Sequence, residues 1–310
     1  MSARQARKRS RRKFGHVVRL HVIHETQYRY SAPVVLSRQL LHLTPRELPW
    51  QTTESHRITL EPPAGEIAER PDYYGNRTVH ALVAAPHESL LVRAESVVSV
   101  KPRARERRAA PKAAWEAVRA RLLARDAPPI VEPAEFLFES PHVERLGELA
   151  DYALQSFTPR RGILEASSDL ARRIHKEFEF DRTATSVSTP LKQVLAGKRG
   201  VCQDFAHLMI GCLRAIGLAA CYVSGYILTH APPGRPRLVG ADASHAWVSV
   251  YCGERAGWVD IDPTNNRIVD DSHVTLAWGR DFGDVTPMRG VILGGGAQSL
   301  TVRVTVTPHS

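Results

Sequence analysis

Residues 200–207 read Gly-Val-Cys-Gln-Asp-Phe-Ala-His, and the first structural prediction concerns the helix that begins here. Apolar side chains recur from Cys202 to Leu213 at intervals of three and four, which predicts a helix with one apolar face that ends near Gly217. A thiol in the first turn of a helix lies near unpaired backbone N–H groups and the positive end of the helix dipole. Both favour the thiolate. Cys202 is therefore a candidate nucleophile.

Two motifs farther along the chain supply the other parts of an activated cysteine. Residues 244–248 read Ser-His-Ala-Trp-Val, and residues 257–264 read Gly-Trp-Val-Asp-Ile-Asp-Pro-Thr. A cysteine nucleophile is activated by an imidazole that takes its proton and by a third group that orients the imidazole. The motifs offer His245 and Asp262 for these two roles.

The two motifs are also predicted to pair as a β-hairpin. The segments on either side of residues 252–255 are rich in β-branched and aromatic residues, which is typical of strands joined by a short loop. In this register His245 lies directly opposite Asp262, with Cβ atoms roughly 5 Å apart. Asp260 shares that face but reaches His245 only if the register shifts by two residues, so it is the reserve candidate.

Further short motifs are spread over about residues 20–296. They lie at residues 191–195, 200–207, 222–226, 244–247 and 262–265 in the C-terminal part, and at residues 24–26, 28–33, 43–46 and 72–76 in the N-terminal part. Together they resemble the transglutaminase-like superfamily, and more closely its bacterial branch, which carries a β-rich N-terminal domain.

The resemblance implies an α+β protein with a papain/transglutaminase-like core, in which the helix bearing the cysteine packs on an antiparallel sheet, preceded by a small antiparallel β domain. It implies Cys202 as nucleophile, His245 as base and acid, and Asp262 as orienting carboxylate. No departure from the family pattern is seen at these three positions.

The activity implied by the resemblance is cysteine-dependent acyl transfer from a glutamine carboxamide or peptide bond, through a thioester, to an amine. The partners would be a protein or peptide substrate and an amine or water acceptor. The superfamily also contains peptidases and amidases, so hydrolysis of a glutamyl or isopeptide bond is the alternative. An intact Cys202, His245 and Asp262 argues against a non-catalytic binding module. The backbone N–H of Cys202 is the natural first oxyanion donor, and the second is not assigned.

No cofactor is required for this chemistry, and no loop shows the closely spaced carboxylates of an EF-hand. A metal site formed by Cys202, His207 and His245 is not favoured, because nothing else in the pattern makes these ligands converge. Asp204 and His207 are instead expected on a polar face of the helix. The residues expected in the core are Tyr28, Tyr30 and Trp50, together with Cys212 and Cys221 as small buried hydrophobes.

The net charge of +10 over 310 residues comes from two short segments of the chain. Residues 1–13 carry +7 and residues 101–112 carry +5, and subtracting both leaves −2 for the rest of the chain. Because the chain outside these two segments is nearly neutral, the sequence does not indicate a surface that binds nucleic acid. The basic tail is interpreted as a solvated extension, with an anionic polymer or membrane surface as the alternative partner.

No apolar run of about 18 residues predicts a membrane span, and the N-terminus lacks the apolar stretch of a secretory signal. The four cysteines show no paired spacing, so no disulfide framework is expected. We therefore expect a cytoplasmic location. The sequence leaves the oligomeric state open.

The expected organisation has five parts. They are a basic disordered tail (1–15), an N-terminal β-rich domain (16–100), a linker and helical segment (101–160), the transglutaminase-like catalytic core (161–296) and a C-terminal strand (297–310).

Overall fold

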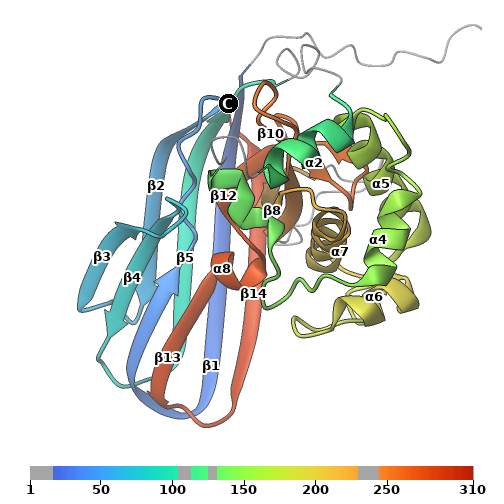
Figure 1. The fold of residues 1–310 in the computed structure, drawn as a ribbon. Helices are drawn as coiled ribbons and strands as arrows, with labels where there is room; N and C mark the ends of the chain where they lie inside the picture. The colour runs from blue at the N-terminus through green and yellow to red at the C-terminus, as the bar shows by residue number, and fades with distance from the viewer. Residues whose placement is uncertain (1–16, 104–112, 125–130, 230–243, 310) are drawn as a thin grey trace, which may run out of the picture.

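A computed structural model describes residues 17–103, 113–124, 131–229 and 244–309 (Figure 1). The predicted basic tail, most of the second basic run and the loop at residues 230–243 lie outside the described residues. Within the described part of the chain, no helix has both the length and the apolar character needed to cross a membrane.

The N-terminal part is an antiparallel sheet built around one long strand. Its members are β1 (Val18–Leu41), β2 (Gln51–Glu61), β3 (Glu66–Pro71), β4 (Arg77–Val83) and β5 (His87–Val100), in the order β2-β5-β1-β4-β3. Along β1 and β5, buried positions alternate with more exposed ones, as expected for strands with one face on the core. The antiparallel β domain expected at the start of the chain thus contains one strand of 24 residues.

The end of the chain returns to this sheet. β13 (Met288–Gly294) pairs with the second half of β1, and β14 (Gln298–Pro308) pairs with the first half, from Leu20 opposite Pro308 to Tyr30 opposite Gln298. β13 lies within residues 161–296, the range expected to form the catalytic core, yet it is a strand of the N-terminal sheet. The N-terminal sheet is therefore completed by the last strands of the chain.

The remaining elements lie in the predicted helical segment (101–160) and in the predicted core (161–296). The helices are α2 (Trp115–Leu123), α3 (Val131–Ala134), the 3-10 turn η1 (Glu135–Leu137), α4 (Gly147–Leu154), α5 (Ile163–Glu177), α6 (Leu191–Gly197), α7 (Cys202–Ala215) and α8 (Phe282–Val285). The strands are β6 (Glu179–Phe180), β7 (Arg199–Gly200), β8 (Ala220–Ile227), β9 (Ser244–Tyr251), β10 (Trp258–Asp262), β11 (Arg267–Ile268) and β12 (His273–Gly279). Antiparallel pairing gives the five-stranded order β11-β10-β9-β8-β12.

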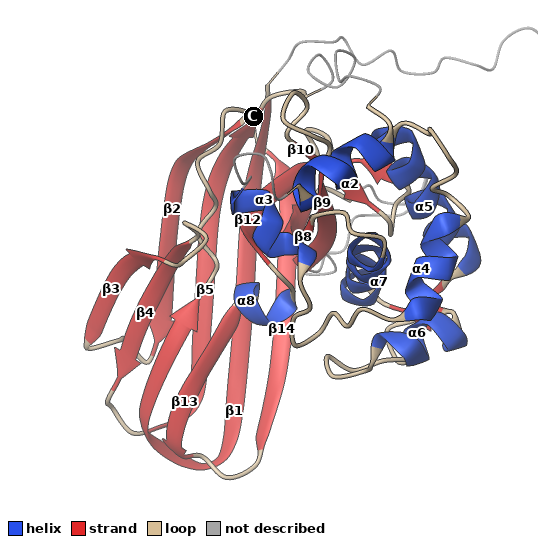
Figure 2. Ribbon diagram, viewed as in Figure 1, coloured by secondary structure: helices blue, strands red, loops and turns tan. Residues whose placement is uncertain are grey.

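The cysteine-bearing helix α7 lies in the middle of this core. Figure 2 shows α2, α4, α5, α6 and α7 on one side of the molecule and the long N-terminal sheet on the other. Every residue of α7 from Asp204 to Arg214 is buried, because the helix packs on β9 and is covered by α4, α5 and α6. The α+β fold predicted from the sequence, with a cysteine-bearing helix on an antiparallel sheet, is confirmed.

The two sheets are joined through the edge strand β12. The side-chain amide of Gln51 donates to the carbonyl of Thr275 and accepts its N–H, both at 2.8 Å. Asn76 makes the same pair of bonds with the backbone of Trp278, at 2.8 and 2.9 Å. These side chains satisfy backbone groups that an edge strand otherwise leaves open. The N-terminal sheet therefore fixes β12, the strand that carries His273.

Candidate active site

Cys202 is the first residue of α7, and the turn before it is closed by Asp204. The Asp204 carboxylate accepts the backbone N–H of Val201 at 2.8 Å and the hydroxyl of Thr185 at 2.6 Å. A Cβ at Gly200 would lie 2.7 Å from this carboxylate, so the glycine leaves room for the cap. Burial raises the pKa of Asp204, although the two hydrogen bonds oppose the shift. The cap holds the helix end at which Cys202 stands.

The expectation of a polar face at Asp204 and His207 is wrong, because both side chains are buried. His207 stacks on His142 with a ring separation of 5.5 Å and accepts the backbone N–H of Phe282 at 3.1 Å. Burial lowers the pKa of His207 to about 3, so this ring is a neutral acceptor. The sequence pattern predicted that this face of the helix is exposed to solvent, because a local pattern does not show that α7 is covered on every side.

His245 stands next to Cys202 at the start of β9. The Cys202 Sγ lies 4.0 Å from the carbonyl oxygen of Ser244, the residue before His245. Burial acts to lower the pKa of His245, but the hydrogen bonds to Asp262 and Cys202 outweigh it and raise the pKa to about 10. Because His245 Nε2 faces Asp262, Nδ1 is the ring nitrogen left for Cys202. The arrangement favours an imidazolium beside the sulfur.

Asp262, the last residue of β10, is completely buried and holds His245 through a 2.8 Å contact between Oδ2 and Nε2. Asn265 donates to the same carboxylate from its side chain at 2.7 Å and from its backbone at 3.1 Å. Burial acts to raise the pKa of Asp262, but hydrogen bonds from the two histidines and Asn265 hold it well below its usual range. The carboxylate is therefore ionised and fixed.

The predicted hairpin register is wrong by two residues. Trp258 pairs with Tyr251 and Ile261 with Val248, so the turn runs from Cys252 to Gly257 instead of ending at residue 255. The longer turn uses Gly253 and Gly257 at positive φ, a conformation that glycine adopts without strain. His245 reaches Asp262 diagonally across the end of β10, a distance that long side chains span.

Asp260 is used elsewhere. It lies opposite Ser249 and forms a 2.6 Å ion pair with Arg103, whose side chain is 7% exposed. The Arg103 guanidinium in turn stacks on Trp50, 4.1 Å from the ring centre, and Trp50 is half-buried there instead of lying fully in the core as expected. The reserve candidate for the orienting carboxylate thus belongs to a contact between the N-terminal part and the core.

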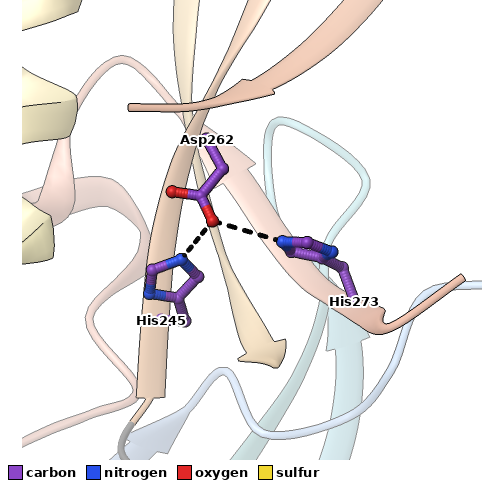
Figure 3. A group of neighbouring side chains, drawn as sticks. All are labelled: His245, Asp262 and His273. Carbon is purple, nitrogen blue, oxygen red and sulfur yellow. Dashed lines mark hydrogen bonds and ion pairs between the residues drawn. The ribbon is translucent and has the colours of Figure 1, made fainter. Parts of the chain in front are cut away.

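A second histidine contacts the same carboxylate, and no motif in the sequence pointed to it. Figure 3 shows Asp262 between two imidazoles, with one oxygen joined to both. His273 Nε2 lies 3.4 Å from Asp262 Oδ2, and His273 Nδ1 lies 3.3 Å from Asp270 Oδ1. His273 is completely buried and packs edge-on against Trp247. Asp262 is therefore held from the side opposite His245 as well.

His245, Asp262 and His273 are also the residues of the described chain whose ligand atoms gather most like a metal site, all within 4.8 Å of one another. A divalent ion there would take the Asp262 oxygen and the His245 nitrogen that now face each other. Their 2.8 Å separation is that of a charge-assisted hydrogen bond, which fits the orienting role and needs no metal.

A cavity of about 410 Å³ opens above Cys202 and His245. One wall comes from the core, including Tyr222 and Phe282, and the opposite wall comes from β1 and β14. Tyr30 is buried in the N-terminal sheet as expected. Tyr28 is half-buried: it stacks on Tyr30 and packs against the same core, and it also lines the cavity. The N-terminal sheet thus lines part of the cavity through which a substrate would reach Cys202.

The His245–Asp262 pair predicts a pH-dependent stability. Because folding raises the pKa of His245, its protonation stabilises the folded state fully below pH 6.5, and this contribution is lost as the pH rises through about 10. Because folding lowers the pKa of Asp262, its ionised form stabilises the folded state above pH 3.8, and this contribution is lost as the pH falls through the lower pKa of the folded state. The pair should therefore stabilise most between about pH 4 and 6.5. Urea unfolding should show the wild type losing its advantage over His245→Gln above this window, by up to about 1.4 kcal/mol per pH unit. A pH-independent difference would contradict the ion pair.

The helix-borne cysteine, packed against an antiparallel sheet with a histidine and an aspartate in contact, defines the papain/transglutaminase-like class of α+β folds. Residues 20–99 match the bacterial transglutaminase-like N-terminal region, and residues 150–263 match the transglutaminase-like superfamily. An uncharacterized protein of Mycobacterium tuberculosis is 40% identical over 94% of this chain and 93% of its own. An uncharacterized protein of Mycobacterium leprae is 30% identical over 93% of this chain and 98% of its own.

Among solved structures, a Cytophaga hutchinsonii protein proposed to be a cysteine protease superposes with a TM-score of 0.73. It covers 95% of this chain and 92% of its own at 20% identity, which shows a shared fold. The chain belongs to the transglutaminase-like superfamily and carries the N-terminal region of its bacterial members.

Proposed function

We propose that this protein is a cysteine acyltransferase that attacks an amide carbonyl through Cys202. The observation that carries the proposal is the chain of contacts from Cys202 to His245 and on to Asp262, at the edge of a cavity that admits a substrate. Such a chain is what a cysteine needs to act as a nucleophile at neutral pH. The family, which includes acyltransferases, supports the proposal.

In the first half of the reaction, the Cys202 thiolate adds to the carbonyl carbon of a glutamine carboxamide or peptide bond. The developing oxyanion accepts the backbone N–H of Cys202. Tyr222 lines the same cavity, and burial raises its pKa well above the usual value, so its hydroxyl keeps its proton and is our candidate for the second donor. His245 gives its Nδ1 proton to the leaving nitrogen as the C–N bond breaks, which leaves a thioester on Cys202.

In the second half, an amine or a water molecule attacks the thioester carbonyl and gives a proton to His245. The C–S bond breaks, the thiolate returns, and the product is a new amide or a free acid. Asp262 keeps the imidazole oriented and stabilises its charged form throughout. The four free thiols support the further proposal that the protein works in a reducing cytoplasm.

The test is incubation with a glutamine-bearing protein and a labelled primary amine. Acyl transfer predicts incorporation of the amine with one ammonia released per amine incorporated. Release of ammonia or of a cleaved peptide without incorporation would assign the protein to the amidases or peptidases of the same superfamily instead. Neither product, with Cys202 intact, would overturn the enzyme proposal.

Selective alkylation of Cys202 is a second expected result. Burial raises the pKa of Cys212 and of Cys252 to about 12 and raises that of Cys221 as well, so these thiols stay protonated and covered. Cys202 is partly exposed at a helix N-terminus. Iodoacetamide at neutral pH should therefore modify Cys202 at least about 10-fold faster than the other three, as followed by peptide mapping. Preferential modification of a buried thiol would count against the site.

A further inference from the structure

The face of the N-terminal sheet that packs on the core continues beyond the core as a wall of the cavity. Leu20 and Val22 on β1, and Val304 and Val306 on β14, are buried in the shared core. Farther along the same faces, Tyr28 on β1 and Val302 and Leu300 on β14 line the cavity with Cys202. One sheet face thus serves both to hold the core and to flank the nucleophile.

The side chains on this part of the face are exposed although they are apolar. Leu300 is 54% exposed and Val302 is 46% exposed, and Phe180 on the core side of the cavity is 48% exposed. Apolar side chains that gather beside a reactive group, instead of being scattered singly, mark a binding surface. The volume of about 410 Å³ is within the range of about 300–1,000 Å³ for small-molecule sites, which are mostly apolar.

The polar groups of the cavity do not offer a partner for a cationic substrate. His24, the buried polar side chain on the β1 wall, is bonded to Tyr226 at 2.8 Å and to Thr26 at 3.1 Å, and burial lowers its pKa to about 4. Among the described residues that line the cavity there is no carboxylate, and outside the reactive pair of Cys202 and His245 the charged side chain is that of Arg182. A lysine or arginine side chain would lose hydration here without gaining an ion pair.

We propose that the wall formed by Tyr28, Leu300 and Val302 is a substrate-specificity site, and that it selects a substrate with an apolar aliphatic or aromatic group near the attacked carbonyl. This inference rests on the proposed function, because it assigns the substrate class of the same site. It also gives the N-terminal sheet a role in the reaction, since β1 and β14 supply one wall of the substrate site.

The test uses three electrophiles that lose chloride to the thiolate and differ only in the substituent on the amide nitrogen, one amide group away from the attacked CH2 carbon: chloroacetamide, N-benzylchloroacetamide and the cationic N-(2-aminoethyl)chloroacetamide. The rate of Cys202 alkylation is measured by mass spectrometry and divided by the rate of each reagent with glutathione. An apolar site predicts that the benzyl reagent exceeds both others by at least about 10-fold, since one apolar group in a fitted pocket is worth about 10–200-fold.

Leu300→Asp should lower the benzyl-to-chloroacetamide ratio toward one, and Tyr28→Ser should lower it independently from the other strand. Leu293→Asp is the matched control, because Leu293 is a leucine with the same 54% exposure on β13, which pairs with the other half of β1, and does not line the cavity. Thermal melting checks that each variant folds. A ratio near one in the wild type, or a ratio that both cavity variants leave unchanged, overturns the inference.

The outcome also separates this inference from the function on which it rests. If Cys202 reacts ahead of the buried thiols with every reagent but without an apolar preference, the nucleophile stands and the specificity site fails. If Cys202 does not react ahead of the buried thiols with any of the three, the proposed function fails.

Discussion

Cys202→Ser is expected to abolish turnover while the protein stays folded. A serine hydroxyl is nearly the size of the thiol, and the side chain stands at the edge of a cavity, so packing changes little. The hydroxyl hardly ionises at neutral pH, and removal of the nucleophile costs about 10⁶-fold in kcat in serine hydrolases. We expect a loss of at least about 10⁴-fold in amine incorporation.

The control is Cys252→Ala, which removes a buried thiol that does not line the cavity. It should keep most of the activity of the wild type, with near-equal kcat. Circular dichroism and thermal melting compare the folds of all three proteins. A serine variant that retains more than a few per cent of the activity would remove Cys202 from the reaction.

Asp262→Asn is expected to lower kcat by about 10⁴-fold, the loss seen when the orienting aspartate of a serine protease is changed in the same way. An amide can still bond to His245, but it does not stabilise the imidazolium, and it faces His273 as well. The mutation should therefore leave KM nearly unchanged and act on kcat. The measurement is steady-state kinetics with a small peptide substrate.

Asp260→Asn is the matched control for this prediction. It makes the same chemical change two residues away on the same strand, and it breaks the ion pair with the buried Arg103 instead. Leaving a buried charge without its partner costs stability, about 3–5 kcal/mol when a pair is broken outright. We expect Asp260→Asn to lower the melting temperature, with kcat reduced less than about 10-fold. A larger kcat loss for Asp260→Asn than for Asp262→Asn would reverse the assignment of the orienting group.

The local secondary structure around the candidate site was predictable from the sequence, and the long-range contacts were not. The interval pattern after Cys202 predicted α7, and the strand-like motifs around His245 and Asp262 predicted β9 and β10, because periodicity is a local property. The register failed because it depends on the turn conformation of Gly253 and Gly257, which residue types alone do not define.

Three other features depend on the tertiary fold. His273 reaches Asp262 only because β12 is an edge strand that the N-terminal sheet holds in place through Gln51 and Asn76. Asp204 is buried where Thr185, distant in the sequence, and the turn before α7 meet its carboxylate. The cavity wall exists because the last strand of the chain pairs with the first. A sequence pattern indicates which face of a helix or strand is apolar, but it does not identify the element against which that face packs.

The most direct test of the central claim is detection of the acyl-enzyme itself. A small activated ester, p-nitrophenyl acetate, is mixed with the protein, the reaction is quenched with acid, and the intact mass and tryptic peptides are measured. We predict one acetyl group per chain, located on Cys202, removed by hydroxylamine as expected for a thioester and missing from Cys202→Ser. An acetyl group on another residue, or an unchanged burst of p-nitrophenol from Cys202→Ser, would contradict the account.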